Sequence, residues 1–379
     1  MKKNSQLKFH SFLEQLQKHP VLSSDWPLPR GAKCTRCRGQ AEVYLPSHHA
    51  KFCPDCFVHF VRTAVTRGLK EVNFQPRPLM VAVSGGKDSL AVWDLLHQLG
   101  YQTKGLHINL GIPGFSEASS QAVADFASPR GLDWSEYCLQ DVFGYSIPEV
   151  HRLLRGKTCS LCGRLKRAFF NRLTVREGFD TLATGHNLDD EAGRLLGNLV
   201  GKRLEHVCKQ YPYLFSPHPG IPAKLKPLYR LEIKELLAYC HLRRITPVQQ
   251  TCSFSRGATS HTFKQALELL EQSMPGTKRS FLFSYLRDPE LKATLAGAQV
   301  QENTALRLNS ESDQTEENQR LKAENNIQGK NEEQKKDFGI CRDCGEPTYD
   351  QRCGICSLLN RLHEKEKAKK HGQQNKDQS

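Results

Sequence analysis

Short apolar runs alternate with helical hydrophobic periodicity through the middle of the chain. Residues 79–83 form an apolar run that ends at a Gly-Gly pair, which predicts a buried strand. The apolar residues between Leu90 and Leu99 then recur at helical spacing. The alternation continues with expected strands at 103–108, 133–137 and 181–184, and with expected helices at 117–126, 160–176 and from Leu188 onward. It predicts an α/β fold with a doubly wound parallel sheet.

Cysteine pairs and changes of composition divide the chain into segments. Residues 302–337 are rich in Glu, Gln, Asn, Lys and Ser and lack aromatic residues, so we expect a flexible polar linker, with a polar helix as the alternative. Beyond Ser357 we expect a short helix and then a Lys-rich tail. The expected segments are an N-terminal extension (1–30), a four-cysteine module (31–75), the α/β domain (76–300), the linker (301–338), a second four-cysteine module (339–362) and the tail (363–379).

Charge and cysteine usage limit the function classes. The formal net charge is +14 with a pI near 9.2, which favours polyanionic partners such as nucleic acids. No run approaches ~20 apolar residues, and the N-terminus lacks the apolar core of a signal peptide, so we expect a cytoplasmic protein without a membrane span. In that reducing compartment, fourteen cysteines indicate metal binding or catalysis rather than disulfides.

The segment between the first expected strand and helix has the character of a phosphate-binding loop. Its glycines allow a tight turn whose backbone N–H groups, with the helix N-terminus, can bind phosphate. It differs from the Walker A pattern, which requires Gly, four residues and then Gly-Lys-Ser/Thr. Serine hydroxyls add donors, the lysine adds charge and the aspartate is a candidate Mg²⁺ ligand. The six residues are Ser84, Gly85, Gly86, Lys87, Asp88 and Ser89.

Two sets of four cysteines have the spacing of structural zinc sites. Each set consists of two C-x₂-C pairs, separated by fifteen residues in the first set and by eight in the second. Four thiolates leave no coordination position for a substrate, so we expect structural or RNA-positioning roles. The expected ligands are Cys34, Cys37, Cys53 and Cys56 in the first module, and Cys341, Cys344, Cys353 and Cys356 in the second.

Three further cysteines lie within the α/β domain. Cys159 and Cys162 open an expected helix beside several cations, an environment that depresses thiol pKa values. Cys252 can complete a set of three thiolates, which suits a [4Fe–4S] cluster with one accessible iron. A redox pair and buried structural cysteines remain the alternatives.

A second polar motif, Thr184 to Glu191, follows the expected strand at 181–184. In doubly wound folds, ligands bind at the edge where such strands end. Asp189 and Asp190 are candidates either for binding Mg²⁺ or for capping the following helix, and we expect at least one of them to cap it.

These motifs in this order resemble the TtcA/TtuA family of PP-loop tRNA thiolases. SGGKDS matches the PP-loop, and CSLCGRLKR, ATGHNLDDEA and the later Cys252 follow it, with a four-cysteine module at each end as in the TtuA-like branch. The resemblance implies tRNA 2-thiolation, in which ATP adenylates a base oxygen and sulfur then displaces AMP. It also implies that residues 76–300 are the thiolation domain and that the cofactors are ATP, Mg²⁺, two Zn²⁺ and a [4Fe–4S] cluster.

The resemblance assigns roles to individual residues. Cys159, Cys162 and Cys252 correspond to the cluster ligands, and Lys166 and Asp190 to active-site residues. The PP-loop residues, with Gly185 and His186, correspond to the nucleotide-binding set. The implied partners are tRNA and a sulfur donor, either a ubiquitin-like protein thiocarboxylate or sulfide. Oligomeric state is left open, although such relatives commonly form homodimers.

Other functions are compatible with parts of the sequence. Within the family, the alternative is TtcA-like synthesis of 2-thiocytidine. A PP-loop ligase or amidotransferase acting on a small molecule leaves the inner cysteines unexplained, and a zinc-ribbon nucleic-acid-binding protein leaves the intact PP-loop unexplained. The chain departs from the family pattern at Ser253, where Pro is frequent, and at 197–203, which lacks the usual acidic end.

Overall fold

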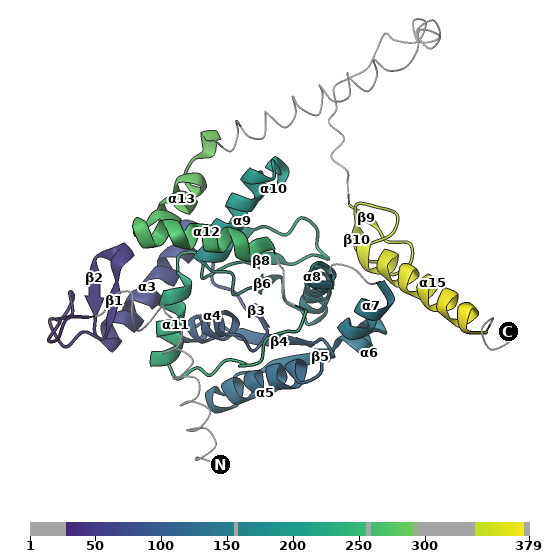
Figure 1. The fold of residues 1–379 in the computed structure, drawn as a ribbon, viewed down its shortest axis with the longest axis horizontal. Helices are drawn as coiled ribbons and strands as arrows, with labels where there is room; N and C mark the ends of the chain where they lie inside the picture. The colour runs from purple at the N-terminus through teal and green to yellow at the C-terminus, as the bar shows by residue number, and fades with distance from the viewer. Residues whose placement is uncertain (1–27, 155–157, 255–258, 292–293, 295–337, 375–379) are drawn as a thin grey trace, which may run out of the picture.

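A six-stranded sheet forms the centre of the molecule in this computed structural model (Figure 1). The structure describes residues 28–154, 158–254, 259–291, 294 and 338–374. Across the sheet the strands are β5 (Trp134–Cys138), β4 (Thr103–Asn109), β3 (Leu79–Val83), β6 (Thr181–Ala183), β8 (Ala223–Leu225) and β7 (Tyr213–Leu214). The first five are parallel, and β7 pairs antiparallel at the edge.

The strand order reverses direction between β3 and β6. From β3 the chain proceeds outward to β4 and β5, then returns to pair β6 with the other side of β3. Such a reversal is a topological switch point, where ligands bind beyond the carboxyl ends of the strands. The predicted phosphate loop follows β3 and the second motif follows β6, so the topology brings both to this point.

Helices cover both faces of the sheet and one end of it. They are α3 (Pro54–Glu71), α4 (Lys87–Gln98), α5 (Phe115–Ala127), α6 (Leu139–Phe143), α7 (Ile147–Leu154), α8 (Thr158–Arg176), α9 (Leu188–Val200), α10 (Leu204–Cys208), α11 (Ile233–Leu242), α12 (Thr259–Ser273), α13 (Thr277–Leu286) and α15 (Gly354–Gln374). Two short antiparallel pairs, β1 (Val43–Leu45) with β2 (Ala50–Phe52) and β9 (Gly339–Ile340) with β10 (Pro347–Thr348), belong to the two cysteine modules.

Alternate side chains of β3 separate two hydrophobic clusters. Leu79, Val81 and Val83 pack in one cluster with α3, α4, α5 and α11, whereas Met80 packs in the other with α7, α8 and α15. Because successive strand side chains point to opposite faces, the two clusters lie on opposite faces of the sheet. A third cluster joins α9, α10, α12 and α13. The N-terminal helix α3 and the C-terminal helix α15 therefore cover different faces.

The predicted α/β fold is confirmed, with differences at the element ends. Helix α4 begins at Lys87, so the last residues of the phosphate loop already belong to it. Helix α15 continues to Gln374, so residues 363–374 of the expected Lys-rich tail are helical, and the expected boundary at 362 falls inside a helix. The expected linker lies outside the described residues except for Phe338. Within the described residues, no helix is both long and apolar enough to cross a bilayer.

Candidate active site at the switch point

The phosphate loop requires glycine at Gly85. Its φ of 72° is unfavourable for other residues, and a Cβ there would lie 2.7 Å from the carbonyl oxygen of Ser119. Gly86 is the N-cap of α4 and provides no side chain to cap its first N–H groups. Those backbone donors at a helix N-terminus can bind an anion such as a phosphate group.

The two loop serines differ in their surroundings. The buried Ser89 hydroxyl accepts a hydrogen bond from the Ser84 amide at 3.1 Å and donates one to the Gly86 carbonyl at 2.8 Å. It therefore holds the loop in shape. Ser84 is exposed, and its hydroxyl lies 3.3 Å from that of Ser89, so Ser84 is the serine better placed to contact a ligand.

Lys87 and Asp88 form a partly exposed pair at the start of α4. Lys87 Nζ lies 2.6 Å from Asp88 Oδ2, and Asn187 Nδ2 donates to Asp88 Oδ1 at 3.2 Å. Asn187 belongs to the second motif, so one carboxylate is held by residues from both motifs. A carboxylate oxygen in this position is chemically suited to Mg²⁺.

Backbone contact joins the two motifs directly. A Cβ on Gly185 would lie 2.8 Å from the carbonyl carbon and oxygen of Asp88 and 2.9 Å from the Ser89 nitrogen. Only glycine allows this approach without a shift of the backbone. The sequence placed Gly185 among the nucleotide-binding residues by resemblance, and the structure gives it a packing reason.

His186 is kept in its neutral form beside these groups. Its Nδ1 lies 2.8 Å from the Thr184 hydroxyl, and burial together with Arg194 lowers its pKa to about 4. A neutral imidazole can exchange a hydrogen bond with a ligand without adding charge.

The adjacent carboxylates Asp189 and Asp190 have different roles. Asp190 forms a capping box with Asn187, accepting from the Asn187 amide at 3.1 Å while the Asn187 side chain accepts from the Asp190 amide at 3.0 Å. The prediction that at least one of the carboxylates caps the helix is therefore confirmed. Burial raises the pKa of Asp190, but its ion pair with Lys264 outweighs burial and holds the pKa below its ordinary value.

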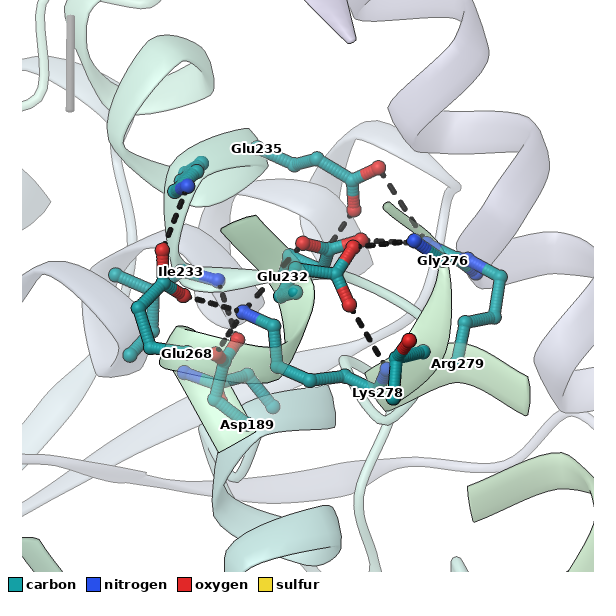
Figure 2. A network of polar contacts seen from close by, with 12 residues as sticks. Asp189, Glu232, Ile233, Glu235, Glu268, Gly276, Lys278 and Arg279 are labelled. Carbon is teal, nitrogen blue, oxygen red and sulfur yellow. Dashed lines mark hydrogen bonds and ion pairs between the residues drawn. The ribbon is translucent and has the colours of Figure 1, made fainter. Parts of the chain in front are cut away.

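Asp189 belongs to a buried ionic network rather than to the ligand edge. It is 5% exposed, pairs with Lys278 Nζ at 2.6 Å and accepts from the Ile233 amide at 2.8 Å. Lys278 also contacts Glu268 at 2.9 Å and Glu232 at 3.6 Å (Figure 2). Asp189 is thus occupied in fixing α9 against α11, α12 and α13, and Asp190 is the carboxylate left near the site.

The inner cysteines come together at the same edge of the sheet. Helix α8 leads into β6, so its first turn, with the exposed Cys159 and the buried Cys162, lies at the carboxyl edge of the strands. Burial raises the pKa of Cys162, nearby Lys166 lowers it, and Cys252 and Cys159 raise it further. Burial outweighs Lys166, so the pKa of Cys162 is raised, and the depressed value that the sequence predicted is wrong for this thiol. These interactions indicate that Cys162 lies near Cys159, Cys252 and Lys166.

Cys252 is brought there by a contact with the phosphate loop. The Val248 amide donates to the Gly85 carbonyl at 2.8 Å, which fixes the segment four residues before Cys252. Cys252 also packs against the cluster that contains Cys162. The sequence contains no local signal for this contact, because Val248 resembles many other apolar residues.

Further cations surround the α8 cysteines. Desolvation and the like charges of Arg194 and Arg164 lower the pKa of Arg167, whose Nη1 lies 3.4 Å from the Cβ position of Gly163. Burial and Arg167 lower the pKa of Lys224 to about 8. This excess of positive charge suits thiolates, phosphate or RNA.

Each terminal module forms a compact four-thiol site. In both, all four Sγ atoms lie within 4.8 Å of one another. The separations of 3.6 Å for Cys37–Cys53 and for Cys344–Cys353 fit a tetrahedral ion, since Zn–S bonds of about 2.3 Å give edges of about 3.8 Å. Burial raises the pKa of Cys34 and Cys341, but backbone N–H donors lower both to about 6, whereas burial and the neighbouring thiols raise the pKa of Cys56 and Cys356. A bound metal would favour the thiolate form of all four.

The inner three cysteines differ from these modules. In the described part of the chain, only the two terminal groups have at least three metal-ligating side chains within 4.8 Å of one another. Three thiolates at wider spacing, one of them exposed, are compatible with a cluster larger than a single ion.

Comparisons with known proteins agree with this arrangement. Residues 33–58 match the family described as "2-thiouridine synthetase TtuA, N-terminal LIM domain". The tRNA-5-methyluridine(54) 2-sulfurtransferase of Thermus thermophilus is 35% identical over 339 residues, covering 89% of this chain and 94% of that protein. Its Pyrococcus horikoshii namesake is 36% identical over 270 residues, covering 69% of this chain and 85% of that protein.

A solved structure has a similar fold. It is described as the U34-tRNA thiolase NcsA from Methanococcus maripaludis with its [4Fe–4S] cluster, and it covers 67% of this chain and 87% of its own length. The TM-score is 0.61 at 25% identity. Together with the switch-point site and the two four-cysteine modules, these similarities show that the chain belongs to the TtcA/TtuA family of PP-loop tRNA thiolases, in its TtuA-like branch.

Proposed function

We propose that the chain is an ATP-dependent tRNA 2-sulfurtransferase. The observation that carries the proposal is the Val248–Gly85 hydrogen bond, because it fixes the segment before Cys252 against the phosphate loop. This contact supports the proposal that ATP is bound and sulfur is transferred at the same edge of the sheet. The homologues named as tRNA sulfurtransferases support the substrate class.

The phosphate loop would bind and orient ATP. The N–H groups at the start of α4 and the Lys87 ammonium bind the phosphates, and Asp88 holds Mg²⁺ with Asn187 fixing its carboxylate. The base carbonyl oxygen attacks the α-phosphorus, and pyrophosphate leaves with the electrons of the broken P–O bond. Sulfur then displaces AMP from the activated carbon.

The inner cysteines would hold the cluster on which sulfur delivery depends. Cys159, Cys162 and Cys252 fit as its ligands, since Cys162 interacts electrostatically with the other two thiols and with Lys166. When bound there, the cluster supplies an open iron for the incoming sulfur atom. Lys166 would stabilise negative charge beside these thiolates, and Asp190 would position Lys264 while capping α9.

The target we propose is 5-methyluridine 54 of tRNA. Two relatives of more than one third identity carry that name, whereas the U34-tRNA thiolase NcsA is 25% identical. Wobble uridine 34 is the second candidate, because the solved NcsA structure shares the fold. The sulfur donor is a protein thiocarboxylate or sulfide, and a homodimer is the proposed assembly.

We also propose a zinc ion in each terminal module. Four thiolates complete a tetrahedron and leave no open position, so these ions would stabilise structure rather than take part in the reaction. The proposed organisation is a thiolation domain at 76–300 between modules at 31–75 and 339–362.

Mass spectrometry of tRNA nucleosides from a deletion strain tests the proposal. Deletion should remove 2-thio-5-methyluridine, and the wild-type gene should restore it. Asp88→Ala and Cys162→Ser should not restore it, whereas Cys138→Ser, at the end of β5 and outside the trio, should. An unchanged nucleoside profile in the deletion strain would contradict the function, and loss of a thiolated wobble uridine instead would contradict the target.

A further inference from the structure

Four arginines from separate parts of the chain surround an open cavity beside the N-terminal module. Arg67 comes from α3, Arg230 from the segment before α11, Arg279 from α13 and Arg287 from the C-cap of α13. The cavity measures about 590 Å³. Ser47 of the module forms part of its wall. None of these residues belongs to the switch-point site.

Positive charge exceeds negative charge in this arginine pocket. Three of its guanidinium groups share Glu71: Arg67 at 3.1 Å, Arg287 at 3.8 Å and Arg230 in closer contact. Burial raises the pKa of Glu71, but the Tyr229 hydroxyl and Arg230 outweigh it, so the carboxylate is ionised. One carboxylate cannot neutralise three cations.

The fourth arginine is anchored in the buried network. Arg279 Nη2 lies 3.4 Å from Glu235 and 3.7 Å from Glu232, and its Nη1 donates to the Arg230 carbonyl at 2.8 Å (Figure 2). Arg279 therefore forms a fixed wall of the pocket.

Phe283 lies against two of the other guanidinium groups, those of Arg230 and Arg287. The guanidinium carbons of Arg230 and Arg287 lie 4.6 and 5.3 Å from its ring centroid. Stacked guanidinium groups keep their N–H donors in a fixed plane. The side chain of Arg230 is 8% exposed, whereas those of Arg67 and Arg287 are 63% and 60% exposed. Arg230 is thus a fixed, buried cation of the pocket, whereas the Arg67 and Arg287 side chains are accessible to a ligand.

We propose that the arginine pocket binds backbone phosphates of the RNA substrate, away from the base that is modified. Arginine pairs bidentately with phosphate, and the hydroxyls of Ser47, Ser280 and Ser284 on the pocket wall add donors of the kind that contact RNA backbones. The proposal rests on the proposed function, because it takes tRNA as the substrate. Contacts of this type fix the register of an RNA without reading its sequence.

The composition of the pocket favours RNA over an acidic protein. Protein-binding pockets centre on apolar anchors, whereas Phe283 is here covered by guanidinium groups. The net charge of +14 adds long-range attraction for a polyanion.

Salt-dependent tRNA binding to the full-length protein tests the proposal. The variant is Arg67→Gln/Arg287→Gln, and the control is Arg152→Gln/Arg176→Gln, which removes the same charge from exposed positions on α7 and α8. Two lost phosphate contacts should reduce the slope of log K against log salt by about 1.5 and raise Kd about 30-fold at 0.1 M salt. The control should keep the wild-type slope, and both variants should keep the wild-type melting temperature and ATP affinity.

The possible outcomes distinguish failure of the arginine-pocket proposal from failure of the proposed function. Wild-type protein that fails to bind tRNA would contradict the proposed function itself. Wild-type binding with an unchanged slope in the Arg67/Arg287 variant would overturn the pocket alone. Loss of poly-glutamate binding in that variant, with tRNA binding intact, would assign the pocket to an acidic protein and also overturn the proposal.

Discussion

The two four-cysteine modules have similar motifs but are attached to the protein in different ways. In the N-terminal module, α3 begins between two of the cysteines, and its Phe57, Val61 and Val65 are fully buried against the same cluster as β3. The C-terminal module contributes Ile355 and Leu358 of α15 to the cluster on the opposite face, where α8 carries the inner cysteines. The N-terminal module is therefore part of the core of the α/β domain, whereas the C-terminal module packs against α8.

Polar contacts repeat this contrast. At the N-terminal module, His48 Nε2 lies 2.9 Å from Glu235, a member of the buried network that also contains Asp189 (Figure 2). At the C-terminal module, Arg172 of α8 pairs with Glu346 at 2.7 Å, and both side chains are about one third exposed. Similar cysteine motifs therefore do not imply equal contributions to stability, and the environment of each module decides what a metal bound there would stabilise.

Replacing one metal ligand in each module should give the largest difference in core stability between the two modules. Cys34→Ser and Cys341→Ser should each lose one zinc by metal analysis. Metal-linked folding free energy is about 10 kcal/mol in small zinc domains, so Cys34→Ser should lower the melting temperature of the whole core. Cys341→Ser should keep core melting and ATP affinity close to wild type. Equal losses of core stability in the two variants would contradict the contrast.

Lys278→Met should cause the next largest loss, by breaking the network on the N-terminal side. It removes the cation that pairs with Asp189 and one of the two cations at Glu232 and at Glu268, and breaking a buried pair costs about 3–5 kcal/mol. Urea unfolding measures this loss. Lys104→Met, which breaks the more exposed pair with Glu177, should cost about 1 kcal/mol or less.

The cost of Lys278→Met should increase with pH. Burial and Glu235 raise the pKa of Glu232 to about 7 in the folded protein. Ionisation of Glu232 therefore destabilises the folded state increasingly as the pH rises above the pKa that this carboxyl has in the unfolded chain. Without the Lys278 ammonium group, ionised Glu232 is less stable in the folded protein. The variant should therefore lose more stability at pH 8 than at pH 6. A loss that is constant over this range would show that the carboxylates are not the cause.

Arg172→Ala should have the smallest effect and should act only on the C-terminal module. The pair with Glu346 is partly exposed and is worth about 1 kcal/mol at most, so core melting should hardly change. Amide exchange should instead increase in β9, β10 and the first turns of α15. Arg176→Ala, one turn further along α8, is the control. Faster exchange in α3 would contradict the assignment.

The sequence predicted the parts of the site whose chemistry is local. SGGKDS lies in a strand–loop–helix context that backbone rules can identify, and both cysteine modules have metal-site spacing. Local residue chemistry did not distinguish Asp189 from Asp190, which only the family resemblance separated, because their difference arises from Lys278 and Lys264, which lie far along the chain. The Val248 contact was missed for the same reason.

Some missed features had local signals. Asn187 precedes two carboxylates at a helix start and is a strong N-cap residue, so the capping box was predictable in detail. The helical continuation of α15 was obscured by its lysines, which were read as a solvated tail, although lysine is a good helix former.

The central claim is that ATP cleavage and sulfur insertion are coupled at one site. The most direct test measures AMP and 2-thio-5-methyluridine in the same anaerobic reaction of reconstituted protein, ATP, sulfide and tRNA that carries 5-methyluridine 54 without sulfur. The account predicts one AMP for each thiolated base, with both products lost in Asp88→Ala. Thiolation without AMP formation, or cleavage of ATP to ADP, would contradict it.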